Sequence, residues 1–139
     1  MAFRNSRYDE ISLEISVKKA ELLVILRKNR EQHNSDYEKA LYFWRKDFAR
    51  VVGELDIQTY TEFPEILEDV RNNCPVSCVS QYDDVIEMFE MGVNEQILLT
   101  SDAYRKFCKD EWSWKSNTYG NFYYKNLQKL EEREKNGQK

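Results

Sequence analysis

Three basic side chains interrupt an apolar stripe in a segment whose spacing predicts one long helix. Arg27, Arg30 and His33 follow each other at three-residue intervals, so they share one helix face. Guanidinium groups in such a row suit a phosphate, because each can donate two hydrogen bonds to an anion. A polar break in a helical seam can instead fix the register of paired helices, with Arg30 held by Glu31, by Glu38 or by an acid of a second copy. Both interpretations stand at the level of sequence.

A second group with binding chemistry lies near the C-terminal end. Trp112, Trp114, Lys115, Asn117 and Tyr119 combine aromatic faces, a cation and an amide within eight residues. These are the groups that hold a nucleotide, since a ring can stack on a base while the cation neutralises a phosphate. Aromatic side chains are more often packing elements, so the two tryptophans can equally close a hydrophobic core.

Residues that would support catalysis are scarce. The chain has one histidine and four glycines, and it shows no nucleophile motif and no phosphate-binding glycine loop. Cys74 and Cys78 have only a loose metal-ligand spacing, and adjacent acids such as Asp83 and Asp84 point in different directions on a helix. We therefore predict a protein that is not an enzyme and that carries no metal or cofactor.

Composition narrows the choice of partners. The 139 residues are 41% hydrophobic and 33% charged, with a formal net charge of −4, which is ordinary for a globular protein. An acidic chain without a basic block is a poor nucleic-acid binder. Neither a membrane-spanning stretch nor a signal-peptide core is apparent, so we expect a cytoplasmic protein with reduced cysteines.

The long helix should run from Lys18 to Leu55, which would make it about 55 Å long. A compact domain of this chain length is only about 35–40 Å across, so the helix should extend beyond its own domain. Its apolar seam would then need a second copy, which predicts a homo-oligomer that is at least a dimer. The seam residues are Tyr37, Leu41, Trp44, Phe48, Val51 and Leu55.

The remaining pattern predicts an α+β fold: an N-terminal strand, one long helix, then a short helix-strand-helix half, with a small antiparallel sheet packed on the helices. Alternating residues predict the first strand at residues 10–18. Residues 56–80 are hard to interpret; they suggest a helical turn at 66–70 and a short strand at 76–79. We expect one domain over residues 1–124 and a charged tail over 125–139, frayed or disordered. The expected C-terminal elements are a helix at 81–92, a strand at 96–99 and a helix that begins after a cap at Thr100, Ser101 or Asp102.

Several segments resemble a family of small phage-encoded proteins. The resemblance spans about residues 11–124 and rests on Leu26–His33, Tyr82–Met91, Ile97–Leu99 and Asp110–Lys115. The resemblance extends to the first-described type of Thoeris anti-defence protein, an oligomeric sponge that sequesters the cyclic ADP-ribose signal of bacterial TIR-domain enzymes. Residues 56–80 do not match the family pattern.

The resemblance implies binding of a small anionic cyclic nucleotide without cleavage. By position, it implies ligand contacts from Arg27 or Arg30, Phe89, Asn94 and Lys115. A lysine where the family has an arginine would weaken planar, bidentate contact with a phosphate. The residues themselves add His33, Trp114 and Asn117 to the candidate ligand-binding set. The alternative function is a protein-protein interaction module that inhibits a host enzyme through its acidic surface and exposed aromatic residues.

Overall fold

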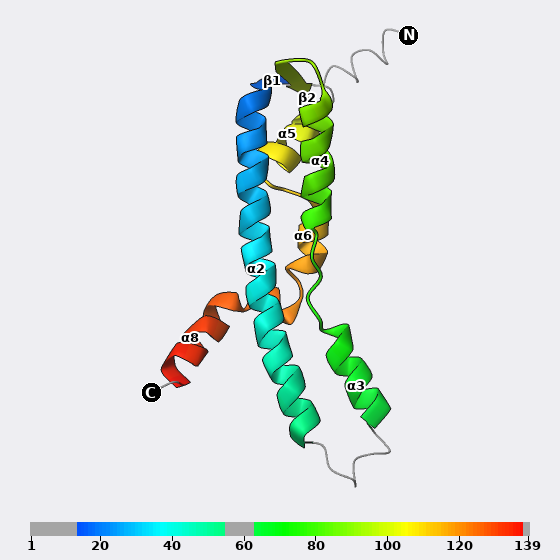
Figure 1. Cartoon of the computed structure of the whole chain (residues 1–139), viewed down its shortest axis with the longest axis vertical. Coiled ribbons are helices and arrows are strands. Elements are labelled where there is room, and N and C mark those ends of the chain that lie inside the picture. The colour runs from blue at the N-terminus through cyan, green and yellow to red at the C-terminus, as the bar shows by residue number, and fades with distance from the viewer. Residues whose placement is uncertain (1–13, 55–62, 138–139) are drawn as a thin grey trace. The chain divides into compact units, whose positions relative to one another are not determined.

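The computed structural model describes residues 14–54 and 63–137, and it has the α+β architecture predicted above. These residues fall into two compact units. The first unit contains residues 14–33 and 78–113, and the second contains residues 34–54, 63–77 and 114–137. The long helix α2 (Lys19–Glu54) contributes its first half to one unit and its second half to the other, and its bounds confirm the predicted helix within one residue at each end (Figure 1).

The first unit pairs two short strands beside two antiparallel helices. Strand β1 (Ile15–Lys18) lies antiparallel to β2 (Gln96–Leu99), with Ile15 opposite Leu99. Helix α4 (Val79–Met91) runs back along the first half of α2 (Figure 1), as the bonds between the two helices described below require. The structure thus confirms the small antiparallel sheet and the strand at 96–99; residues 10–13 of the predicted first strand lie outside the described part.

Apolar residues at helical spacing hold this unit together. Leu22 and Leu26 of α2 are fully buried, and α4 contributes Tyr82, Ile86 and Phe89 at the intervals that keep one helix face inward. Burying a side chain of this size stabilises a fold by about 1.5–3 kcal/mol relative to leaving it exposed. Packing between α2 and α4 therefore defines the unit.

Helix α5 (Ser101–Cys108) begins and ends with recognisable caps. The Thr100 hydroxyl accepts a hydrogen bond from the Ala103 N–H, which selects Thr100 among the three predicted caps. At the other end, the Glu111 N–H donates to the Arg105 carbonyl, and Asp110 takes a left-handed φ of 60°. This is the geometry in which glycine is usual. The Asp110 carboxylate also accepts a 2.6 Å bond from the Tyr82 hydroxyl, which ties the turn to α4.

The second unit surrounds the later half of α2 with four short helices. They are α3 (Phe63–Asn72), α6 (Ser113–Thr118), α7 (Phe122–Lys125) and α8 (Leu127–Gly137). The buried core cluster of this unit joins Ala40 and Phe43 of α2 to Tyr123 and Tyr124 of α7 and Leu130 of α8. The Tyr123 hydroxyl donates a 2.7 Å bond to the Asp47 carboxylate, so its polar end is satisfied at the edge of this cluster.

The seam that the sequence assigned to a second copy is partly covered from within the chain. The Trp44 indole N–H donates a 2.8 Å bond to the Val70 carbonyl of α3, and the Trp44 ring stacks on Phe48 at 5.2 Å between centres. Tyr37 also packs against the core of the second unit. Tyr37, Trp44 and Phe48 therefore take part in packing within one chain.

Two other expectations differ from the structure. The strand predicted at 76–79 is wrong: residues 74–78 form no regular element, and Val79 already begins α4. Pro75 lacks the N–H that a strand would use, and the Val76 carbonyl instead accepts a bond from the Tyr124 hydroxyl. For the residues after 124, where a frayed helix or a disordered end was expected, residues 127–137 form helix α8, and Leu130 is buried beside Ala40 and Phe43 of α2.

Candidate functional site

The two arginines expected to bind an anion face acidic residues of α4. Arg27 forms an ion pair with Glu90, and the Arg30 Nε donates a 2.5 Å bond to Asp83. A second bond, 2.9 Å long, joins Arg30 to Glu31. The hydrogen bond with Asp83 raises the pKa of the Arg30 guanidinium. A phosphate would have to displace these carboxylates, so the structure gives Arg27 and Arg30 an ion-pairing role between α2 and α4.

The His33 side chain is buried and bound to a backbone N–H group. Its side chain is only 1% exposed, and its Nε2 accepts a 2.9 Å bond from the Cys78 N–H just before α4 begins. This acceptor must be unprotonated, and the bond satisfies a donor near the helix start, where N–H groups lack intrahelical partners. His33 therefore positions α4 on α2.

The other two candidates in the first unit do not join the arginines in one site. Phe89 is 9% exposed and packs edge-to-face on Phe107, with ring centres 5.7 Å apart. Asn94 lies exposed in the loop between α4 and β2. A ring packed in the core cannot stack on a ligand base without opening the unit, which removes Phe89 as a ready binding surface.

The aromatic and cationic candidates of the second unit do lie close together. The Trp114 and Tyr119 rings are nearly parallel with centres 6.4 Å apart, and the Lys115 ammonium lies 5.2 Å from the Tyr119 ring centre. Asn117 is exposed on the same short helix, α6. An acidic group is also near, because the Tyr119 hydroxyl donates to Asp36 at 3.3 Å. Trp112, by contrast, belongs to the first unit, where it is buried beside Tyr82.

The sequence reasoning missed a surface on the outer side of α4. Asp84, Glu87, Met88 and Met91 recur at helical spacing on the side opposite Tyr82, Ile86 and Phe89, and all four are exposed. Met88, Met91 and nearby Val93 are 54%, 75% and 89% exposed. We call Asp84, Glu87, Met88, Met91 and Val93 the outer α4 face. The sequence analysis overlooked it because two helical faces of this segment carry large apolar residues.

The charge of this face is unbalanced. Helix α4 carries four acids and no basic residue. Asp83 and Glu90 are paired with the arginines of α2, whereas Asp84 and Glu87 have no cationic partner within the described part of the chain. Exposed methionines beside unpaired carboxylates favour an apolar partner that is also basic.

Residues 14–54 and 63–137 contain neither a metal-binding cluster nor a membrane-spanning helix. No group of three or more histidine, cysteine or acidic residues there could hold a metal ion. No helix in the same ranges is long and apolar enough to cross a membrane. Comparison with known proteins adds no identity, since no family model, curated protein or solved structure matches the chain.

Proposed function

We propose that this protein acts by binding rather than by catalysis, and that it is an interaction module that docks a basic protein surface on the outer α4 face. The observation that carries the proposal is the exposure of Met88, Met91 and Val93 next to the unpaired carboxylates of Asp84 and Glu87. Isolated apolar residues are normal on a protein surface, but a run within one helix end is characteristic of an interaction site.

The chemistry of the face defines the partner. Methionine side chains adapt to different apolar shapes, so they suit an amphipathic helix or an aromatic anchor of another protein. Lysine or arginine residues of that partner would meet Asp84 and Glu87. Occupation of a host enzyme in this way would inhibit it stoichiometrically, without turnover.

The test compares matched variants in capture from host-cell lysate. Met88→Ser with Met91→Ser removes the two methionines of the face without touching the buried residues of α4. Val24→Ser is the control, because Val24 is an apolar residue of the same unit that is 62% exposed on α2. We expect one stoichiometric protein that is retained by wild type and by the control and lost with the double variant. Equal retention by all three would contradict the proposal.

A second candidate function is capture of an anionic cyclic nucleotide, cyclic ADP-ribose in type, at α6. It is favoured by the placement of Trp114, Lys115 and Asn117 on one short helix, with a stacked ring pair and a cation. Incubation with the nucleotide, filtration and then denaturation tests it. Intact nucleotide released only on denaturation, and lost with Lys115→Ala, would support capture. Nucleotide free in the filtrate would exclude it.

A further inference from the structure

The exposed side of the second half of α2 is unusually apolar for a helix face turned away from its core. Leu41, Tyr42, Ala49 and Val52 lie on the side of α2 away from the buried Ala40 and Phe43. Leu41 is half-buried, Tyr42 and Val52 are 47% and 40% exposed, and the Tyr42 hydroxyl donates a 2.7 Å bond to Glu134 of α8. About three turns of helix thus present apolar residues on a side where an amphipathic helix normally carries charges.

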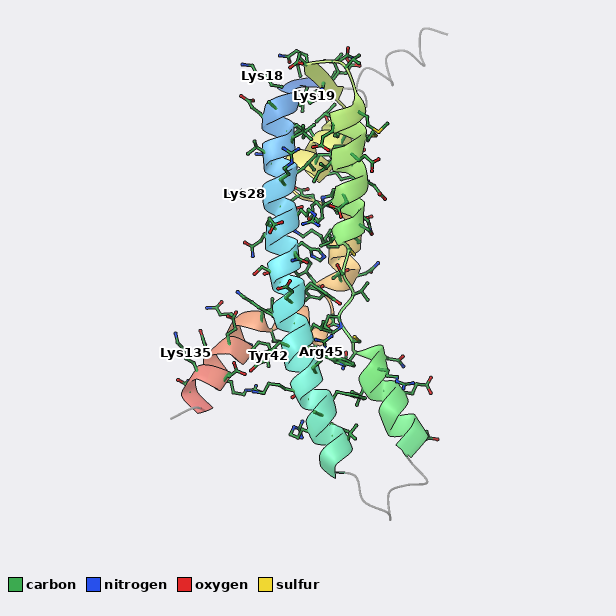
Figure 2. The ribbon with its side chains drawn as sticks, in the orientation of Figure 1. Lys18, Lys19, Lys28, Tyr42, Arg45 and Lys135 are labelled. Atoms are coloured by element: carbon green, nitrogen blue, oxygen red, sulfur yellow. The ribbon has the colours of Figure 1, made fainter. Side chains whose placement is uncertain are left out.

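This face also holds a shallow hollow whose lining includes one acidic and two basic residues. The hollow is lined by Glu38, Leu41, Tyr42, Arg45, Lys46 and Ala49. Tyr42 and Arg45 both lie on this half of the helix (Figure 2). Lys46 is paired with Glu134 of α8, but Glu38 and Arg45 have no oppositely charged partner in the described ranges.

We infer that a second copy of this chain docks on this face, with the two α2 helices antiparallel. Glu38 and Arg45 are seven residues apart, which places them about 10.5 Å apart along the helix, too far to pair with each other. A two-fold axis between Leu41 and Tyr42 brings Glu38 of each copy opposite Arg45 of the other, because in such an interface each contact occurs twice.

The same register places the apolar residues together. Leu41 of one copy lies against Tyr42 of the other, between the two charge pairs, which then flank an apolar centre. A basic or an acidic foreign partner would satisfy only one of Glu38 and Arg45, whereas a second copy satisfies both. One helix face is smaller than the roughly 800 Å² per partner of a standard interface, so we expect a dissociation constant in the micromolar range.

The inference does not depend on the proposed function, because its residues belong to the second compact unit and the outer α4 face belongs to the first. It also differs from the dimer expected from the sequence, with which it shares only Leu41. That dimer used Trp44 and Phe48, and the structure covers Trp44 with α3.

Charge reversal gives a test that separates docking from folding. Glu38→Arg and Arg45→Glu each place like charges opposite one another in the dimer, so sedimentation velocity should show dimerisation at least about tenfold weaker for either single variant. The double variant E38R/R45E restores both pairs and should dimerise within a few-fold of wild type. A mixture of the two single variants should form heterodimers, since one contributes two arginines and the other two glutamates.

Circular dichroism on the same samples shows whether each variant remains helical. Heterodimer formation would also show that both single variants are folded, because a variant that failed to fold could not associate with the other. A wild-type protein that stays monomeric at about 100 μM would overturn the inference. So would a double variant that remains monomeric while it is folded.

Discussion

Individual residues that suggested ligand chemistry serve the fold in this structure. Arg30 binds Asp83, His33 accepts from the Cys78 N–H, and Phe89 packs on Phe107. The sequence showed that the polar break on α2 needs partners, but it could not show that α4 supplies them. Pairs such as Arg30–Asp83 join residues 53 positions apart. Local periodicity carries no information at that range.

The role of His33 can be tested by removing its acceptor. His33→Ala leaves the Cys78 N–H without the buried nitrogen that it contacts, and an unsatisfied buried donor costs about 1–3 kcal/mol. We expect the free energy of unfolding in urea to fall by at least that amount, since the variant also loses packing. His33→Gln offers an amide oxygen as a replacement and should lose less. Unchanged stability with lost nucleotide binding would assign His33 to a ligand instead.

Tyr123 predicts a specific loss of stability at alkaline pH. Burial, and then its hydrogen bond to Asp47, raise the pKa of the Tyr123 hydroxyl above tyrosine's usual range. The folded state therefore favours the protonated hydroxyl. The stabilisation from the protonated Tyr123 hydroxyl is complete below pH values of about 10, the pKa of tyrosine in the unfolded chain. It decreases as the pH rises above that value. Between pH 8 and 11, the free energy of unfolding should fall less steeply for Tyr123→Phe than for wild type. Parallel curves for the two proteins would refute this coupling.

Among the elements, those with a strong period were predictable. The long helix, the strand at 96–99 and the helix capped at Thr100 follow from spacing and capping chemistry. The segment at 76–79 was mistaken for a strand because four apolar or small residues without a period fit several structures. The helix α8 was underestimated because one buried residue, Leu130, anchors a segment that is otherwise charged.

The ion pairs between α2 and α4 should contribute little to the free energy of unfolding. Arg30 and Asp83 are partly exposed, with side chains 31% and 50% accessible, and exposed pairs contribute roughly 0–1 kcal/mol. Arg30→Gln should therefore lower the unfolding free energy by about 1 kcal/mol or less and leave protein partner binding unchanged. Calorimetric melting measures the stability of this variant, and capture from lysate measures its binding of a protein partner. A large loss of nucleotide binding in this variant would return Arg30 to the ligand site.

The turn after α5 offers a comparison of backbone and side-chain contributions. Asp110 combines a positive φ with a bond from Tyr82, so Asp110→Ala loses the bond and keeps the strained backbone. Asp110→Gly loses the same bond but relieves the backbone, because glycine adopts positive φ readily. In urea unfolding, we expect the Asp110→Gly variant to be more stable than the Asp110→Ala variant by about 1 kcal/mol. The reverse order would mean that the turn is not strained.

At the scale of the whole molecule, the surfaces that we propose for binding lie in different parts of the chain. The outer α4 face belongs to the first compact unit, and the α6 group and the exposed side of α2 belong to the second. The candidate residues predicted from the sequence were drawn from both units, so they do not form one site within either. Sequence spacing identified residue types suited to binding, but only tertiary contacts show which of them the fold already uses.

The central claim, that the outer α4 face binds a basic protein, is tested most directly by site-specific photo-crosslinking in host cells. A benzophenone amino acid at position 91 should give one crosslinked protein, and its crosslinked peptide should carry lysine or arginine beside apolar residues. The same group at position 24, also an exposed apolar site of the first unit, should give no such product. No crosslink at position 91, or the same products at both positions, would contradict the account.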